Sequence, residues 1–178
     1  MNLKPFLTTT LLVGALSATP EFVYAKTYLT VDQAKKILVP NVKLEKLEIV
    51  LTKEQQKAIK KLSKVRVNND KINAYKTSDG GWFIIDQVIG KHENIDIAVS
   101  IDKYGKVSGV EVLTYRETYG GEVRNQKWLA QFLGKDNNEH LRLDKQIKNI
   151  SGATLSCRHI TNGVNRLMHT WNEVLRYI

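Results

Sequence analysis

The 178-residue sequence contains very little cysteine, and Cys157 is its only one. A single cysteine excludes a disulfide within the chain, and the absence of a Cys-x-x-Cys-His motif excludes covalently attached haem. The fold must therefore rest on its hydrophobic core, and a chain of this length is long enough to bury one. We expect Cys157 to pack inside that core and not to act as a redox thiol.

Histidine is also scarce, with four residues in the chain. His159 and His169 are ten residues apart on a predicted helix, so they would not bind the same metal ion. His92 and His140 belong to no motif that binds metal. We expect all four on the surface or in the core, and we predict neither a metal site nor a catalytic side chain.

Acidic residues are outnumbered, with 18 Asp and Glu against 27 Lys and Arg and a net charge of +9. A basic protein is suited to an anionic membrane surface or an acidic partner. No motif for nucleic-acid recognition is present, so nucleic acid is a poor candidate. Five lysines share the outward face of a helix predicted over residues 53–64. That face is either a docking surface for an acidic partner or lipid, or a solvated helix face, and we favour the second interpretation.

Long hydrophobic runs are absent apart from Phe6–Ala18, which is too short to span a membrane comfortably. Lys4 precedes this run, and Val23-Tyr24-Ala25 fits a cleavage site. Residues 1–25 are therefore predicted to be a cleaved secretory signal peptide, with an uncleaved anchor as the alternative. No cysteine follows the run, which excludes a lipoprotein anchor. The predicted location is the periplasm or the extracytoplasmic face of a bacterial cell.

Hydrophobic periodicity predicts an α+β fold. Strands are predicted over residues 44–51, 72–77, 81–89, 96–101 and 107–114. Capping boxes at Thr30 and Thr52 predict two short N-terminal helices, and further helices are predicted over 125–133 and from about Ser156 onward. Apolar residues alternate with polar ones in the middle strands. This pattern predicts an antiparallel meander with one buried face, flanked by the short N-terminal helices and the long C-terminal helix.

Two glycine-containing loops are candidates for ligand binding. The last predicted strand runs into residues 115–123, where Gly120 and Gly121 permit a close approach to a ligand or simply mark a flexible loop. The turn at Ser151–Ser156 collects hydroxyl groups and free amides at the start of the final helix. That position suits a phosphate group, although an ordinary helix cap is the common alternative.

Three sequence blocks carry a resemblance to a known family. They are Glu117-Thr118-Tyr119-Gly120, then Trp128 with Phe132, then Ile150-Ser151-Gly152-Ala153-Thr154-Leu155-Ser156. In this order they resemble the exported FMN-binding domain family, which includes the flavin-bearing subunits of the Rnf complex and of the sodium-pumping NADH:quinone reductase, and domains of the NosR type. The resemblance covers about residues 80–175, and residues 26–178 are predicted to form a single FMN-binding domain.

The resemblance implies that FMN is joined through its phosphate to Thr154 as a phosphoester. A flavin transferase would form this bond after export, taking FMN from FAD with the help of magnesium. The other residues implied at the site are Ser151, Gly152, Ala153, Leu155 and Ser156 around the phosphate, with Glu117, Thr118, Leu113 and Trp128 near the isoalloxazine ring. Lys148 or Arg158 would offset the phosphate charge. The family usually has Asp six residues before the acceptor, where this chain has Lys148, and non-covalent FMN is the alternative.

The predicted function is that of an electron carrier, because FMN performs the redox chemistry and no side chain need act as a general acid or base. Electrons would pass from a membrane-bound donor to a redox partner protein or a small acceptor outside the cytoplasm. Two alternatives stay open on the sequence alone. One is a flavin-dependent reductase with its own small-molecule substrate, and the other is a module without flavin that docks through its lysine-rich helix.

Overall fold

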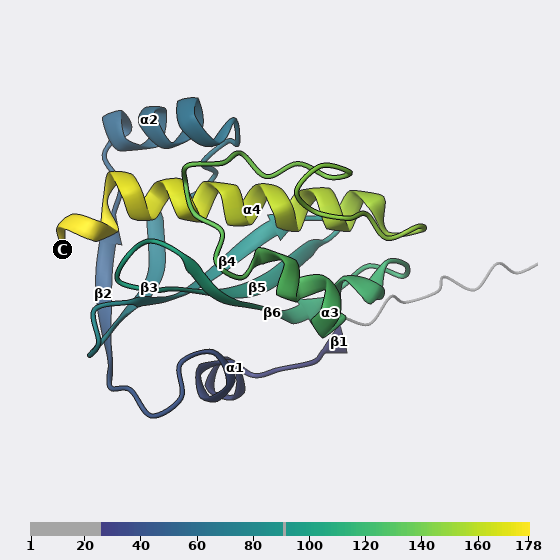
Figure 1. Ribbon diagram of the computed structural model, residues 1–178, viewed down its shortest axis with the longest axis horizontal. Helices are drawn as coiled ribbons and strands as arrows, with labels where there is room; N and C mark the ends of the chain where they lie inside the picture. The colour runs from purple at the N-terminus through teal and green to yellow at the C-terminus, as the bar shows by residue number, and fades with distance from the viewer. Residues whose placement is uncertain (1–25, 91) are drawn as a thin grey trace, which may run out of the picture.

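A computed structural model describes residues 26–90 and 92–178 of the protein (Figure 1). The predicted signal peptide, residues 1–25, lies outside the described residues. Within the described part of the chain, no helix combines the length and the apolar character needed to cross a membrane.

The molecule is built on a six-stranded antiparallel sheet in the order β1-β6-β5-β4-β3-β2. Strands β2 to β6 follow one another as a meander, and the short β1 pairs with the outer side of β6. The strands are β1 (Lys26–Thr27), β2 (Leu44–Val50), β3 (Lys71–Thr77), β4 (Trp82–Ile89), β5 (Asn94–Ile101) and β6 (Val107–Tyr115). The predicted α+β fold and its meander are confirmed.

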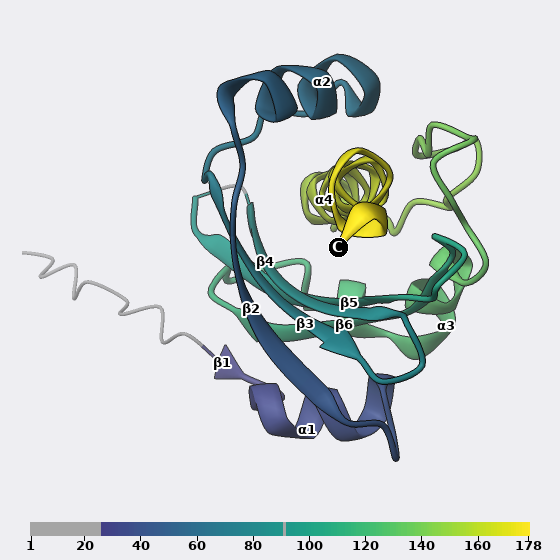
Figure 2. The same cartoon turned by 90° about the vertical axis from the view of Figure 1, so that its left-hand side faces the viewer.

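Helices lie on both sides of this sheet. They are α1 (Val31–Leu38), α2 (Lys53–Ser63), α3 (Gln126–Leu129) and α4 (Thr154–Glu173), with 3-10 turns η1 (Gly121–Arg124), η2 (Ala130–Phe132) and η3 (Leu175–Tyr177). Figure 2 looks along α4 and shows it lying in the concave side of the curved sheet, with α1 against the opposite face. Helix α2 packs beside α4, on the side away from the sheet.

The main core lies between α4 and the concave face of the sheet. The apolar face of α4 is buried against the sheet and includes Ile160, Val164, Leu167 and Trp171, and Val174 and Leu175 just after the helix are buried as well. Gly163 lets the helix approach β4, because a Cβ atom at this position would lie 2.5 Å from Cγ1 of Val88. Packing along its whole length therefore holds α4 in place.

The prediction of a single buried face is wrong, because the sheet buries side chains on both faces. A second cluster of Ala34, Phe83, Ala98 and Leu113 lies beneath α1. The backbone N–H groups of Tyr28 and Leu29 both donate to the carbonyl oxygen of Leu113, which fixes the segment that leads into α1. The alternation in the strands is real, but small and apolar residues on the second face leave room for a helix to cover it.

Both predicted capping boxes are confirmed. The Thr30 hydroxyl accepts a hydrogen bond from the N–H of Gln33 at 3.2 Å, and the Gln33 side chain accepts from the N–H of Thr30 at 2.8 Å. Thr52 and Gln55 make the same pair of bonds at the start of α2. Each box satisfies two amides that would otherwise have no partner at the helix end.

The helix predicted over residues 125–133 is divided. Asn125 caps α3 through the N–H of Lys127, and the chain then tightens into η2. The N–H of Leu133 donates to the carbonyl of Ala130, three residues earlier, which is the 3-10 pattern common at helix ends. The segment still buries Trp128 and Phe132, as the apolar spacing predicted.

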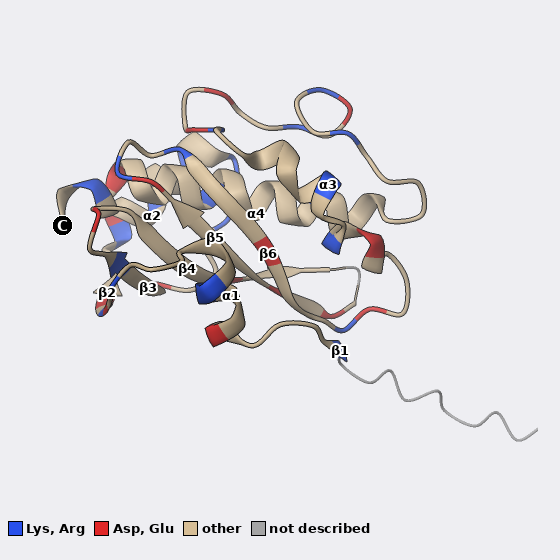
Figure 3. Ribbon diagram, turned by 60° about the horizontal axis from the view of Figure 1, so that its bottom comes forward, with Lys and Arg blue, Asp and Glu red and all other residues tan. Residues whose placement is uncertain are grey.

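A buried carboxylate connects this segment to the sheet. Glu111 is the acidic residue in the middle of β6, drawn red in Figure 3. Both of its carboxylate oxygens accept hydrogen bonds from Nε2 of Gln126, at 2.9 and 3.0 Å, and burial raises its pKa. The bond fixes the start of α3 against the strand whose end carries the Glu-Thr-Tyr-Gly loop.

Candidate functional site

The candidate site begins at the turn that leads into α4. Ser151 and Gly152 are exposed, and Gly152 has a φ of 84°, which favours glycine. The N–H of Ala153 donates to the carbonyl of Ile150 at 3.0 Å and closes the turn. Thr154 is then the first residue of the helix, and it is half-buried.

The N-terminus of α4 is not capped. Its N-cap residue is Ala153, and no side chain makes a capping hydrogen bond there. The alternative prediction of an ordinary Ser or Thr cap is therefore wrong. The amides of Thr154, Leu155 and Ser156 precede the first intrahelical bond, which runs from Cys157 to Ala153. These amides and the positive end of the helix dipole make a suitable site for an anion.

Side chains from α3 and η2 hold the segment just before this turn. The indole Nε1 of Trp128 donates to the carbonyl of Lys148 at 2.7 Å, and Oε1 of Gln131 accepts from the N–H of Lys148 at 2.8 Å. Trp128 is 5% exposed and packs edge-on against Phe132. Its role in the structure is to position this segment, and a contact with the flavin ring stays a prediction.

Asn149 contacts the predicted attachment residue directly. Its Nδ2 donates to the hydroxyl oxygen of Thr154 at 3.0 Å. The exposed side chains of Lys148 and Arg158 lie on either side of the turn in sequence. The hydroxyl at the uncapped end is thus held by a neighbour, and two cations are available close to it in the chain.

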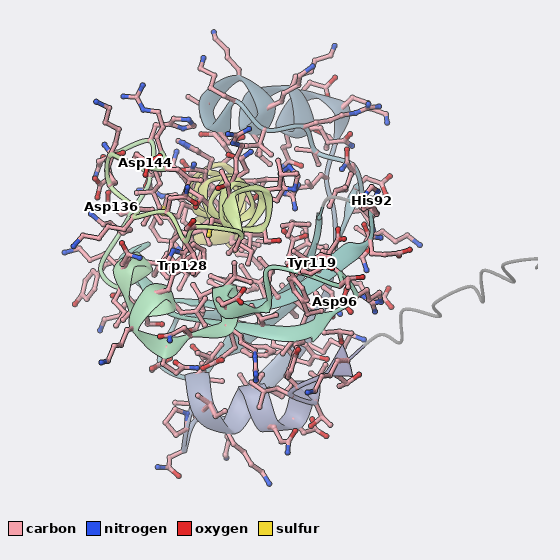
Figure 4. The ribbon with its side chains drawn as sticks, turned by 90° about the vertical axis from the view of Figure 1, so that its right-hand side faces the viewer. His92, Asp96, Tyr119, Trp128, Asp136 and Asp144 are labelled. Atoms are coloured by element: carbon pink, nitrogen blue, oxygen red, sulfur yellow. The ribbon has the colours of Figure 1, made fainter. Side chains whose placement is uncertain are left out.

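The Glu-Thr-Tyr-Gly loop meets the first turn of α4 through Tyr115. The Tyr115 hydroxyl donates to the carbonyl of Tyr119 at 2.5 Å and lies 2.8 Å from Oγ of Ser156. Burial, the largest influence on this group, raises the pKa of Tyr115, so the hydroxyl keeps its proton. Figure 4, viewed from the side of the molecule where α4 begins, labels Tyr119 and Trp128, which lie on different sides of the helix.

Gly120 allows this close approach. It has a φ of 92°, and a Cβ atom there would lie 2.6 Å from the Tyr115 hydroxyl oxygen and 3.4 Å from Cβ of Ala153. A side chain at this position would push the loop away from the helix. Two motifs that are about thirty residues apart in sequence are therefore joined in space by a glycine contact.

Glu117 connects the same loop to the hairpin between β4 and β5. Its Oε1 accepts hydrogen bonds from the N–H groups of His92, at 2.6 Å, and Glu93, at 3.0 Å. A Cβ atom on Gly90 would lie 2.4 Å from this oxygen, so the hairpin also needs a glycine to come this close. The contact of Glu117 with the flavin ring stays a prediction, and so does that of the exposed Thr118.

The structure does not bring Leu113 to the other candidate residues. Its side chain is 3% exposed and lies in the cluster beneath α1, on the face of the sheet opposite α4. Among the remaining candidates, Ser156 and Ala153 are buried against the loop, and Leu155 is 39% exposed. The predicted flavin contact of Leu113 therefore has no support from its position.

Two further residues of α4, one buried and one half-buried, complete the surroundings of the site. Cys157 is fully buried, as expected for a packing residue, and burial raises the pKa of its thiol. Burial, followed by the charge of Arg158, lowers the pKa of His159, although backbone groups of Gly90 and Ile89 oppose this shift. His159 therefore places an uncharged imidazole near the hairpin that Glu117 holds.

A polar cavity of about 530 Å³ lies elsewhere, between α4, β4 and the segment before β3. Arg166 projects into it and pairs with Asp86 at 2.5 Å. Its lining includes none of the residues predicted from the sequence to bind FMN. Among residues 26–90 and 92–178, the His, Cys, Asp and Glu side chains form no group of three or more suited to a metal ion.

Sequence reasoning missed two residues of this site. The sequence pattern puts Tyr115 in the polar loop after the predicted strand, whereas the structure makes it the last residue of β6, two residues before Glu117. Asn149 belongs to no recognised block, although only the four residues 150–153 separate it from Thr154. Both act through contacts across the turn or between elements, which a one-dimensional pattern does not reveal.

Comparisons with known proteins agree with the geometry. Residues 90–169 match the family described as FMN-binding domain. A subunit of an ion-translocating oxidoreductase complex from Shewanella piezotolerans is 33% identical over 113 residues, covering 56% of this chain and 53% of that protein. The proteins of the same name from two strains of Aliivibrio fischeri are 34% identical over 88 residues, covering 43% of this chain and 42% of each relative. The chain thus spans about half the length of the curated relatives it matches.

Proposed function

Because residues 90–169 belong to the FMN-binding domain family, we propose that this protein is an exported flavoprotein that carries electrons. FMN would supply the redox chemistry, and the protein would bind it, orient it and limit side reactions. The relatives are named as subunits of an ion-translocating oxidoreductase complex. We therefore place the electron donor in a membrane complex and the acceptor on the extracytoplasmic side.

The observation that carries this proposal is the contact between the Glu-Thr-Tyr-Gly loop and the uncapped end of α4. A Cβ atom on Gly120 would lie 3.2 Å from Oγ of Ser156 and 3.4 Å from Cβ of Ala153, so a residue without a side chain lets the loop lie against the first turn of α4. A ligand with a phosphate at one end and a flat ring system at the other fits this arrangement. Its phosphate would face the free amides, and its ring would lie toward the loop.

Thr154 is the proposed attachment residue. It is the first residue of α4, half-buried, with the exposed Ser151 and Gly152 before it, so an enzyme has access to the turn. A phosphoester retains one negative charge, which the helix amides and the cations of Lys148 or Arg158 would offset. Covalent attachment would also prevent loss of the cofactor outside the cytoplasm.

The loop side of the site suits electron transfer to a partner. Thr118 is exposed, and the Tyr119 ring is 82% exposed although its carbonyl is held by Tyr115. A rigid backbone with an open surface lets a partner protein approach the cofactor without a large rearrangement. No proton transfer by a side chain is required, so we describe the protein as a carrier.

The intact mass of the mature protein, exported in cells that contain a flavin transferase, tests the proposal. Attached FMN should add roughly 440 Da, and the yellow colour should survive denaturation. Thr154→Val should abolish the added mass. Thr52→Ala, which removes another threonine hydroxyl at a helix N-terminus, should retain it.

The outcomes separate the alternatives. Colour that is lost on denaturation, without added mass, would mean bound but untethered FMN and would contradict attachment at Thr154. A colourless protein without added mass would contradict the flavin-carrier function altogether. Added mass that persists in Thr154→Val would move the attachment to another residue.

A further inference from the structure

Asn149 holds the hydroxyl that the proposed function uses. Its Nδ2 lies 3.0 Å from Oγ1 of Thr154 and donates to it. The other amide atom, Oδ1, is buried and accepts no hydrogen bond from any residue that the structure describes. An amide that is only half satisfied in a buried place is unusual, because an unpaired buried acceptor lowers stability.

The backbone around Asn149 is fixed from two directions. The preceding residue, Lys148, is held by Trp128 at its carbonyl and by Gln131 at its N–H. On the other side, the Ala153 to Ile150 bond closes the turn that brings Thr154 back toward Asn149. The side-chain amide is therefore ordered before any ligand binds, and the conformational entropy of this side chain is already lost when the protein folds.

We propose that Asn149 is the positioning residue for covalent flavin attachment, an inference that rests on the proposed function of Thr154. A threonine hydroxyl at the start of a helix can adopt more than one χ1 rotamer. The hydrogen bond from Asn149 selects one rotamer and holds Oγ1 in a fixed direction at the uncapped helix end. The transferase then meets a nucleophile that is already oriented.

Asn149 neither donates nor accepts a proton in the attachment step. Oγ1 of Thr154 bonds to the phosphorus of the FMN half of FAD, and the bond from that phosphorus to the AMP phosphate oxygen breaks. AMP leaves with the electron pair, and the hydroxyl proton passes to a base of the transferase. An amide is too weak an acid or base to take part, so Asn149 acts on geometry alone.

The test measures attachment to the full mature chain by purified flavin transferase with FAD and Mg²⁺, followed by intact mass. Asn149→Ala should lower the apparent kcat by about tenfold or more and leave KM for the protein substrate within about twofold. Asn138→Ala, at an exposed asparagine on the same stretch of chain between η2 and α4, is the matched control and should behave as wild type.

A second variant guards against misfolding. Asn149→Asp has nearly the same shape but replaces the donor with a negatively charged acceptor next to the incoming phosphate. It should lower kcat at least as much as Asn149→Ala while its thermal unfolding stays cooperative. Wild-type kcat in Asn149→Asp or Asn149→Ala would overturn the proposal. A raised KM with unchanged kcat would also overturn it, because Asn149 would then serve recognition by the transferase.

Failure of this inference is distinguishable from failure of the proposed function. If the wild-type chain gains no mass under these conditions, attachment at Thr154 is wrong and the inference falls with it. If the wild type gains mass, Thr154→Val does not, and both Asn149 variants react at the wild-type rate, then only the positioning role of Asn149 is wrong.

Discussion

The N-termini of three helices in this protein are built in two different ways. Helices α1 and α2, of 8 and 11 residues, each begin with a complete capping box. Helix α4, with 20 residues, begins at Ala153 without any side-chain cap. The shorter helices need their caps, because short isolated helices are barely stable in water. The longest helix is held by packing along its length, so its end can remain open.

The backbone shows why a cap forms at one kind of end and not at the other. Thr30 and Thr52 have ψ angles of 160° and 164°, the extended conformation that lets a side chain reach the third amide of the helix. Ala153 has a ψ of 17°. The turn at Gly152 therefore places at the N-cap a residue that has neither the extended conformation nor a side chain for a capping bond, and the first amides of α4 receive no cap.

Among these changes, substitution of Gly120 should have the largest effect, because it disrupts the contact between the loop and the uncapped N-terminus of α4. Gly120→Ala adds a Cβ atom at 2.6 Å from the Tyr115 hydroxyl oxygen, at a φ of 92°. We expect a loss of about 2–3 kcal/mol in the free energy of unfolding, from backbone strain and steric contact together. Urea denaturation measures this loss, and intact mass should show reduced flavin attachment because the loop moves away from α4.

Gly134→Ala is the matched control for this change. Gly134 also has a positive φ, of 75°, but a Cβ atom there would meet nothing within 4 Å. Its cost should be only the backbone strain, about 1 kcal/mol, with normal flavin attachment. Equal losses in the two variants would mean that the contact between the loop and α4 contributes nothing to stability.

Removal of the Trp128 hydrogen bond should make the segment around Lys148, just before the uncapped N-terminus of α4, less well fixed. Trp128→Phe retains an aromatic ring but leaves the carbonyl of Lys148 without its donor, which should cost about 2 kcal/mol. Flavin attachment should slow as well, because the segment that carries Asn149 is less fixed. Trp82→Phe, beside Trp171 toward the other end of α4, should lose stability without slowing attachment. A Trp128→Phe chain with a normal attachment rate would contradict the role of Trp128 in fixing the segment that carries Asn149.

The capped ends and the strands could be predicted from the sequence, since they depend on neighbouring residues. Thr30 with Gln33 is a local signal, and so is the alternation in β5. The burial of Phe83 and Leu113 could not be predicted, because it depends on where α1 packs. The uncapped N-terminus of α4 could not be predicted from the sequence either. Ser151 and Thr154 are both residues that often cap helices, yet the turn makes Ala153 the N-cap.

Local pattern made the two glycine-containing loops candidates for ligand binding, but only the resemblance named FMN and the residues expected to bind it. Thr154 and the Glu-Thr-Tyr-Gly loop were named from the matching blocks. The contact that joins them, from Tyr115 to Ser156, spans 41 residues and has no signature in the sequence. The bond from Asn149 to Thr154 spans five residues, but it depends on the exact direction of the turn.

Lower pH should destabilise the C-terminal part of α4, around His169, without changing the difference between the capped and uncapped helix ends. Burial, followed by the neighbouring His140, lowers the pKa of His169, although Glu173 opposes the shift. Burial and the charges of Arg142 and Lys64 lower the pKa of His140. As pH falls below the unfolded value of about 6.5, the unfolded chain therefore takes up protons that the folded chain resists.

The free energy of unfolding should thus fall from about pH 7 to about pH 5, by up to about 1 kcal/mol per pH unit for each such histidine. Urea denaturation at several pH values measures the slope. His169→Gln should flatten it, whereas Thr52→Ala should lower the curve without changing its slope. A slope that is unaffected by His169→Gln would assign the pH dependence to other groups.

The smallest predicted effect is the sharpest test of the two kinds of helix end. Thr52→Ala removes a capping hydroxyl and should cost about 1 kcal/mol, because the amide of Gln55 loses its partner. Thr154→Val removes a hydroxyl from the first residue of α4 but removes no cap. Measured in an Asn149→Ala background, where no amide loses its acceptor, its cost should be below about 0.5 kcal/mol. Denaturation of both chains without flavin measures the difference. The two changes should therefore have opposite profiles: Thr52→Ala is less stable and fully flavinylated, whereas Thr154→Val is nearly as stable as its Asn149→Ala parent and carries no covalent flavin. A loss of stability from Thr154→Val in the Asn149→Ala background as large as that in Thr52→Ala would mean that the Thr154 hydroxyl caps the helix, and the end of α4 would then not be free for a phosphate.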